Sequence, residues 1–296
     1  MNQPGYLQLS EAELRGRSEI LSEALKNCRL CPRHCETDRT RHSSGYCQTG
    51  HLAVVSSAQL HFGEEPEISG THGSGTIFFS HCNLHCQFCQ NHEISQAGYG
   101  QTVSAAELAA LMLNLQRRGA HNINFVTPSH VTAQILEALC LAVPKGLQLP
   151  LVYNSGGYDT PHTLEVLEGI IDIYMPDFKT LSQDFASNYL DAPDYPENVT
   201  AALQEMHRQT GLLQTDSNGI AERGLLIRHL VMPGRLEDTR QILTWIADNL
   251  SPKTHVNVMG QYHPAHNARQ HPQLASSLSI LEYQQALALK KEILSD

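Results

Sequence analysis

The sequence has no long apolar run and no excess of positive charge. Its 296 residues contain no stretch of apolar residues long enough for a transmembrane helix. The chain has 20 lysines and arginines against 30 aspartates and glutamates, which gives a formal net charge of −10. The broad positive field that a general nucleic-acid binder or anionic-membrane binder uses is therefore missing. We expect neither nucleic acid nor a membrane as a partner.

The first residues also lack a secretory signal, because Met1 to Gly5 contain no basic region and no apolar region follows. We expect a cytoplasmic protein, in which thiols stay reduced. Seven of the eight cysteines nevertheless fall into two tight groups, and clustered reduced thiols favour metal binding over disulfides. The composition, with 41% hydrophobic and 17% charged residues, is that of a packed globular protein rather than a disordered one.

From about residue 75 onward, short β-branched or aromatic runs alternate with helical stretches, after a first expected helix at 10–27. The expected strands are 76–79, 123–126, 151–153, 170–174, 225–231 and 256–258. The expected later helices are 104–118, 132–142, 161–168, 196–211, 239–250 and 279–294. This alternation predicts a parallel sheet, open or curved into a barrel. The least regular segment, 176–200, is expected to be a long loop.

Directly after the first of these strands, Cys82, Cys86 and Cys89 follow the spacing C-x3-C-x2-C. Soft thiolates select zinc or iron–sulfur clusters, and a structural zinc site is normally closed by four ligands. Three thiolates leave one iron of a cubane cluster open, and an open iron can bind a substrate or cofactor. A zinc knuckle and a cluster without catalytic chemistry are the alternatives.

A second cysteine group lies nearer the N-terminus, in a segment with almost no apolar residues. Its spacing is C-x2-C-x3-C-x11-C, formed by Cys28, Cys31, Cys35 and Cys47. Ordinary burial cannot order such a segment, whereas a metal can. Four thiolates close either a tetrahedral zinc site or a second iron–sulfur cluster. The histidines that could replace one of these cysteines are His34, His42 and His51.

The three-cysteine loop and its surroundings resemble the radical S-adenosylmethionine (SAM) enzymes. Phe88 stands just before the third cysteine, and six expected strand–helix units lie in one chain. The residues 73–80, Gln90-Asn91 and 228–234 are similar to the pyruvate formate-lyase activating enzyme group. The N-terminal cysteines look like those of uncharacterised homologues in that branch. The resemblance covers roughly residues 25–265.

The resemblance implies an α/β fold, a partial (β/α)6 TIM-type barrel with a cysteine-containing N-terminal extension. We divide the chain into an N-terminal helix at 1–27, a metal-binding extension at 28–60 and a radical SAM core at 61–296. The cysteine loop would hold a 4Fe-4S cluster whose open iron binds SAM. The reduced cluster would cleave SAM to methionine and a 5′-deoxyadenosyl radical, which abstracts hydrogen from a substrate.

The same resemblance implies partners. The electron donor would be a flavodoxin or ferredoxin, and the leading substrate is a glycyl-radical enzyme activated on a backbone Cα–H. Modification of another peptide or of a small molecule is the alternative within this family. A non-enzymatic iron–sulfur or zinc protein is the alternative outside it.

Candidate SAM contacts besides Phe88 follow the expected strands. Many family members carry Gly-Gly-Glu after the second strand, but this chain has Thr127-Pro128-Ser129-His130 there. In those members Gly-Gly-Glu receives the amino group of SAM. Here backbone carbonyls or the hydroxyls of Thr127 and Ser129 would take that role, unless the segment is only a tight turn. Asn154 and Ser155 follow the third strand, where activating enzymes present polar groups to SAM.

Three charged residues and one histidine complete the set. Asp177 and Lys179 follow the fourth strand and match an Asp-x-Lys pattern of the activating enzymes, with a rim salt bridge as the alternative. Arg228 lies within the fifth strand, where a buried cation needs a carboxylate partner, either that of SAM or that of Asp177. His263 follows the sixth strand, near adenine if it is functional and structural otherwise.

Overall fold

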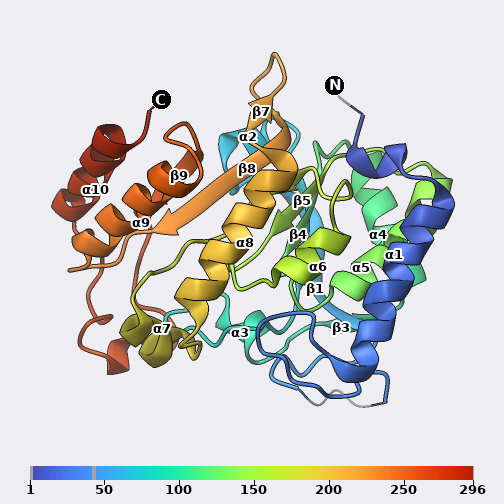
Figure 1. Ribbon diagram of the computed structural model, residues 1–296, viewed down its shortest axis with the longest axis horizontal. Coiled ribbons are helices and arrows are strands. Elements are labelled where there is room, and N and C mark those ends of the chain that lie inside the picture. The colour runs from blue at the N-terminus through green and yellow to red at the C-terminus, as the bar shows by residue number, and fades with distance from the viewer. Residues whose placement is uncertain (1–2, 42–44, 296) are drawn as a thin grey trace.

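The computed structural model describes residues 3–41 and 45–295 of the chain. One of the proposed alternative ligands, His42, lies outside these residues. Figure 1 shows a central sheet with helices packed around it and a long loop between the first helix and the first strand. That loop lies at the same end of the molecule as the short helices α3 (His92–Ser95) and α7 (Gln183–Leu190).

Six strands run parallel, and each pairs with the next along the chain. In spatial order they are β2 (Ser74–Phe79), β4 (Ile123–Val126), β5 (Leu151–Asn154), β6 (Ile173–Tyr174), β8 (Ala221–Leu230) and β9 (His255–Met259). The helices that follow them are α4 (Ala105–Arg117), α5 (Thr132–Ala142), α6 (Pro161–Val166), α8 (Tyr195–Thr210), α9 (Leu236–Asn249) and α10 (Ile280–Ile293). The predicted α/β fold, a partial (β/α)6 barrel, is confirmed.

Antiparallel strands extend this sheet, and the sequence patterns did not predict them. β1 (Ala53–His61) pairs antiparallel with β2, β3 (Gln101–Val103) pairs with β1, and β7 (Gln214–Thr215) pairs with β8. The outer neighbour of β2 is therefore β1 rather than β9. β1 also takes up the end of the stretch 28–60, and the division into extension and core stays a prediction.

Two local predictions were wrong. The segment 176–200 is not one long loop, because it contains α7 and the beginning of α8. The Ser182 hydroxyl caps α7 by accepting a hydrogen bond from the Phe185 backbone N–H. Of the strand expected at 170–174, only Ile173–Tyr174 is extended and paired. The residues before it form the turn that ends α6.

The N-terminal segment packs on the outside of the barrel. It begins with a 3-10 turn, η1 (Gly5–Gln8), and α1 (Glu11–Ala24) is followed by a second, η2 (Leu25–Asn27). The predicted capping box is present, since Ser10 and Glu13 exchange side-chain and backbone hydrogen bonds. α1 lies against α5, and its buried residues Leu14 and Leu21 join the main apolar core. Two further 3-10 turns are η3 (Val143–Lys145) and η4 (Ala268–Gln270).

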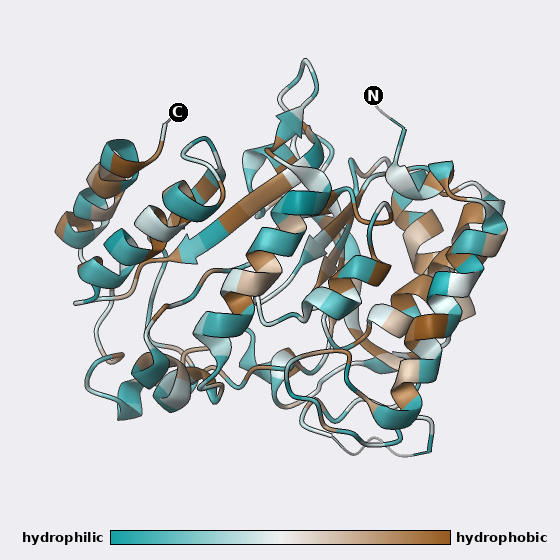
Figure 2. Cartoon of the chain, viewed as in Figure 1, coloured by the Kyte–Doolittle hydropathy of each residue, from teal (hydrophilic) through white to brown (hydrophobic). Residues whose placement is uncertain are grey.

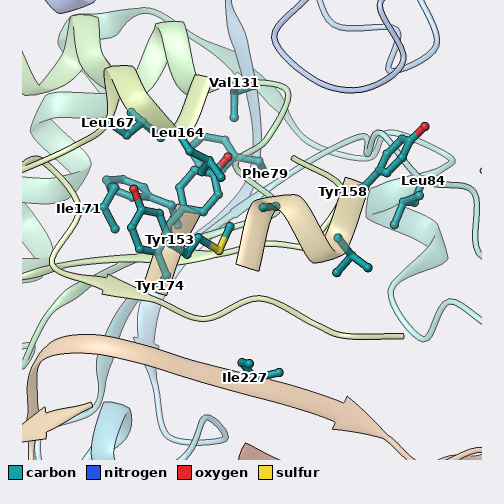
Figure 3. Packing of buried hydrophobic residues seen from close by; sticks show 14 of the residues in the cluster. Phe79, Leu84, Val131, Tyr153, Tyr158, Leu164, Leu167, Ile171, Tyr174 and Ile227 are labelled. Atoms are coloured by element: carbon teal, nitrogen blue, oxygen red, sulfur yellow. The ribbon is translucent and has the colours of Figure 1, made fainter. Parts of the chain in front are cut away.

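Successive strand residues point to opposite faces of the sheet, and this period of two separates two cores. On β5, Tyr153 belongs to the apolar layer between sheet and helices, while Val152 belongs to a smaller cluster inside the barrel. Figure 3 shows Tyr153 and Tyr174 packed among apolar side chains of the first layer. Figure 2 shows the complementary pattern, with a largely brown β8 behind helices that carry teal, hydrophilic turns outward. No helix in the described part of the chain combines the length and apolarity needed to cross a membrane.

The barrel is filled at the N-terminal end of its parallel strands by α2 (Pro66–Ser69) and the two glutamates before it. Ile68 is fully buried in the lumen cluster, and its carbonyl accepts a hydrogen bond from Asn122 Nδ2 at 2.8 Å. Glu65 Oε1 accepts another from Asn257 Nδ2 at 2.7 Å. The open end is therefore the one at the C-terminal ends of the strands.

Candidate active site

The loop after β2 brings the three cysteines to the open end of the barrel. It begins at His81, whose backbone adopts a left-handed conformation with φ of 66°. The loop is held by short contacts, including Leu84 N–H to Cys82 Sγ at 3.3 Å and Gln96 Nε2 to the Cys86 carbonyl at 3.0 Å. All three cysteines, Cys82, Cys86 and Cys89, line one cavity of ≈ 150 Å³.

The same cavity contains most of the polar residues that follow the strands. Those lining it are Thr127, Asn154, Ser155, Asp177, Lys179 and Arg228. The alternation along the strands explains this placement, because Asn154 and Arg228 stand two residues after the lumen-facing Val152 and Leu226. Polar side chains therefore occupy the next lumen positions toward the open end.

Arg228 is the centre of a partly buried charge network. Its Nε donates to Asp177 Oδ1 at 2.9 Å and its Nη1 to Glu64 Oε2 at 3.3 Å. Lys179 Nζ donates to Asp177 Oδ2 at 2.8 Å. Burial alone would raise the pKa of Asp177, but the charges of Arg228 and Lys179 outweigh it and hold that pKa below its usual value. Asp177 is therefore an anion that fixes two cations in the cavity wall, and the carboxylate expected for Arg228 is present within the protein.

Glu64 was missed by sequence analysis, although it is as central as Asp177. It leaves the filled end of the barrel and reaches up the lumen, where Oε1 accepts from Asn124 Nδ2 at 3.1 Å and from Asn154 Nδ2 at 3.4 Å. Burial raises its pKa, and the neighbouring Arg228 only partly opposes that shift. The only signal in the sequence was that Arg228, within a strand, needs a carboxylate partner. Nothing in the sequence identifies Glu64 as that partner.

The residues in place of Gly-Gly-Glu divide into two groups. Thr127 lines the cavity in a left-handed conformation with φ of 61°, and its N–H donates to the Asn154 carbonyl at 2.9 Å. Ser129 is fully buried and lies against Asp159 instead. The Ser155 hydroxyl likewise donates to Asp159 Oδ2 at 2.7 Å. The structure thus brings Thr127 to the cavity, while the Ser129 and Ser155 hydroxyls face the carboxylate behind it.

A second cavity of ≈ 230 Å³ adjoins the first and shares the wall formed by Asp177, Lys179 and Arg228. Phe88 lines this second cavity, with its ring 6.0 Å from Phe185 and 6.2 Å from Tyr262. His263 lies outside both cavities, where it is exposed and contacts Gln90 at 3.3 Å.

The comparisons with known proteins bear on this geometry. The sequence model described as "Radical SAM superfamily" matches residues 76–246, which include the cysteine loop and every strand from β4 to β8. The chain belongs to the radical SAM superfamily. A curated relative, "Uncharacterized protein MJ0674" of Methanocaldococcus jannaschii, is 30% identical over 282 residues, which cover 93% of this chain and 77% of the relative. Among solved structures, "Structure of TYW1 with a lysine-pyruvate adduct bound" aligns with a TM-score of 0.45 and 12% identity, covering 78% of this chain and 77% of that one.

The cysteine loop suits the iron–sulfur cluster that a radical SAM enzyme uses. Burial raises the pKa of Cys82 and of Cys86 to about 12, and in both cases the charge of Lys179 opposes the shift. These thiols therefore stay protonated until a strongly bound cation displaces the protons. No three histidine, cysteine, aspartate or glutamate side chains within 3–41 and 45–295 are arranged around a single metal ion. The three thiols share the lining of one cavity with polar side chains.

The N-terminal cysteines line a separate, small cavity in this radical SAM protein, together with His130. Arg39 is 2% exposed beside it, and its guanidinium contacts Cys28 Sγ at 3.5 Å and the Thr49 carbonyl at 2.8 Å. The guanidinium of Arg39 therefore lies against one of the four thiols in the wall of this cavity. The other alternative ligands, His34 and His51, do not both belong to the cavity, because only His34 lines it.

Proposed function

We propose that this protein cleaves SAM reductively and uses the resulting radical to abstract hydrogen from a peptide substrate. The observation that carries the proposal is the cavity lined by the three cysteines of one loop together with Asn154, Asp177 and Arg228. Cys82, Cys86 and Cys89 would hold a 4Fe-4S cluster. When bound, that cluster supplies one electron to the sulfonium of SAM, which yields methionine and the 5′-deoxyadenosyl radical.

The chain's own residues bind and orient SAM. Arg228 and Lys179 line the same cavity as the three cysteines and would offer two fixed positive charges to the SAM carboxylate, while Asp177 holds both cations in position. Asn154 receives one Arg228 N–H at Oδ1 and directs its own Nδ2 to Glu64, so its carboxamide is fixed at the cavity wall. Thr127 presents its backbone and hydroxyl where the family's acidic residue is missing.

The second cavity supports the proposed substrate class. Its lining combines the apolar side chains of Phe88, Leu230, Met232 and Met259 with the carboxamides of Gln90, Asn91 and Gln261. Carboxamides pair with backbone N–H and C=O groups, and apolar neighbours keep water from a carbon radical. This lining, together with the resemblance to activating enzymes, supports a glycyl-radical enzyme as the substrate. A flavodoxin or ferredoxin would donate the electron.

We also propose that Cys28, Cys31, Cys35 and Cys47 hold a second metal group, an iron–sulfur cluster or zinc. The enclosed cavity that they line and the buried Arg39 support this assignment.

The test uses anaerobically purified full-length protein reconstituted with iron and sulfide. Iron and zinc are counted per chain, and 5′-deoxyadenosine is measured after addition of dithionite and SAM. We expect about four or about eight irons, with 5′-deoxyadenosine formed. About four irons together with one zinc would assign zinc to the N-terminal site. A folded, iron-loaded protein that never cleaves SAM would contradict the proposal, and zinc at both sites would favour a binding protein. A peptide with the sequence around the radical-bearing glycine of a glycyl-radical enzyme should then show a glycyl radical signal. If no such signal forms, the substrate is not a glycyl-radical enzyme.

A further inference from the structure

The two loops that carry the cysteine groups are in direct contact, although 34 residues lie between Cys47 and Cys82. Tyr46 precedes Cys47 and His85 precedes Cys86. Their rings stack with centroids 4.2 Å apart and an interplanar angle of 28°. The Tyr46 hydroxyl also donates to Asp191 Oδ2 at 2.7 Å, which fixes the ring against the barrel.

Arg33 strengthens this junction from the N-terminal side. It lies between Cys31 and Cys35 in sequence, and its Nε donates to the Asn83 carbonyl at 2.8 Å. Its guanidinium lies 3.6 Å from the centre of the Tyr46 ring, in the range of a cation–π contact. Its Nη1 donates to the Asp191 carbonyl at 2.5 Å. One arginine therefore joins the first cysteine segment to the backbone of the second.

Asn83 is the residue that both groups share. It follows Cys82 directly and is 1% exposed, with its Nδ2 donating to the Tyr158 carbonyl at 2.6 Å. Its Oδ1 lies 3.9 Å from Cys82 Sγ. The same carboxamide also lies against the Cys31 thiol of the N-terminal group. A buried carboxamide is costly unless its polar groups are satisfied, so Asn83 is restrained by partners from both cysteine groups.

We propose that the two cysteine sites form one coupled centre, in which Asn83 and Arg33 are positioning residues that transmit occupancy of the N-terminal site to the Cys82–Cys89 loop. The inference rests on the proposed metal at the four-cysteine site. A metal there fixes Cys31 and, through the backbone, Arg33. Those two residues restrain Asn83, and Asn83 restrains its neighbour Cys82. When the N-terminal site is empty, Asn83 loses this restraint, and Cys82, the first ligand of the Cys82–Cys89 loop, is held less firmly.

The experiment compares full-length variants after anaerobic reconstitution. Cys31→Ser weakens the N-terminal site, and Asn83→Leu removes the shared carboxamide while keeping a side chain of similar size. The matched control is Asn267→Leu. Asn267 Nδ2 donates to Gln87 Oε1 in the same loop at 3.1 Å. Two quantities are measured: the rate at which an iron chelator removes the SAM-responsive cluster, and the electron paramagnetic resonance line shape of that cluster after reduction.

We expect Cys31→Ser and Asn83→Leu each to speed cluster loss at least threefold and to change the line shape in the same direction. The double variant should be no faster than either single one, because both changes break the same connection. Asn267→Leu combined with Cys31→Ser should instead multiply the two effects. Independent, multiplying effects of Cys31→Ser and Asn83→Leu would overturn the proposal, as would an unchanged line shape in Cys31→Ser.

Two further results keep the test decisive. If Asn83→Leu does not fold, Arg33→Met replaces it, since that change removes the Nε hydrogen bond to Asn83 and keeps the apolar stem. Wild-type protein that cleaves SAM but holds metal only at Cys82–Cys89 would overturn the coupling and leave the proposed function intact. Wild-type protein that loads both sites and shows the coupling, but never cleaves SAM, would contradict the proposed function alone.

Discussion

Arg228 and Asn154 meet inside the barrel, where the arginine Nη2 donates to the carboxamide Oδ1 at 2.6 Å. The two residues come from strands β8 and β5, which are separated by β6. Only side chains that both point into the lumen can span that distance. Glu64 accepts from both of them, so three elements of the chain meet at one point of the cavity wall.

Arg228→Lys should weaken SAM binding at least tenfold while the protein still folds. Lysine keeps the charge near Asp177 but cannot contact Asp177, Glu64 and Asn154 at once, as the guanidinium fork does. Equilibrium binding of SAM to the reconstituted protein measures the effect. Arg223→Lys, on the same strand but bonded to the Gln209 carbonyl, is the control and should bind SAM normally. Unchanged binding in both variants would remove Arg228 from the SAM site.

Cys86→Ala should abolish both the brown chromophore of the three-cysteine site and SAM cleavage. Two thiolates cannot retain a cubane cluster of which the third ligand is lost. Absorbance after reconstitution and the yield of 5′-deoxyadenosine test this. Cys140→Ala is the matched control, because Cys140 lies on α5, outside both cysteine groups, and should leave both signals intact. SAM cleavage retained by Cys86→Ala would mean that other residues hold the cluster.

Thr127→Gly tests whether Thr127 binds SAM or only forms the turn after β4. The left-handed φ of 61° costs threonine about 1–2 kcal/mol, and glycine relieves it while losing about 1 kcal/mol through its more flexible unfolded chain. The free energy of unfolding should therefore change by less than about 1 kcal/mol. The dissociation constant for SAM should rise several-fold, and Thr127→Ser should restore it. Equal SAM affinity in all three proteins would leave Thr127 with the turn alone.

Asp172 should make folding less stable as the pH rises. Its carboxylate accepts from the N–H groups of Gly5 and Leu151, at 2.8 and 2.9 Å, but burial dominates and raises its pKa to about 6. The folded state therefore holds a proton that the unfolded state has already released near pH 5. The contribution is fully present below the unfolded pKa of about 4 and is lost as the pH rises through about 6.

The measurement for Asp172 is the difference in unfolding free energy between wild type and Asp172→Asn. That difference should move against the wild type by about 1–2 kcal/mol between pH 5 and pH 7.5. The asparagine variant has no proton to release at this position. Subtracting its unfolding free energy therefore removes the pH dependence that all other groups contribute. A constant difference across this range would show that Asp172 is ionised throughout.

The regular part of the barrel could be predicted because its strands are short apolar runs and its helices carry their own caps. Ser104, for example, caps α4 through a capping box with Glu107, a signal that is purely local. β1 has no such signal, since its residues after Val55 are only half-buried and its strand forms by pairing with β2. α7 was hidden by the turn-forming residues that follow it, although Ser182 marks its start.

The residues that line the cavity could largely be predicted, whereas those that support them could not. Cysteine spacing is a local property, and strand ends are known once the strands are, so Cys82, Asn154 and Asp177 could be named from the sequence. Glu64 could not, because its position depends on how the segment before β2 folds into the barrel. The contact between Tyr46 and His85 is equally beyond reach, since two loops without regular structure meet there.

The filled end of the barrel determines from which side SAM and a substrate can reach the cavity. Glu64, Glu65 and Ile68 fill the lower lumen, so the cavity beside the cysteines lies at the open end, and the second cavity adjoins it toward β9. If the polypeptide substrate proposed above covers this opening, SAM must enter before it. Methionine and 5′-deoxyadenosine would then leave only after that polypeptide withdraws. Binding would be ordered, and an excess of peptide substrate should slow turnover by trapping the spent cosubstrate beneath it.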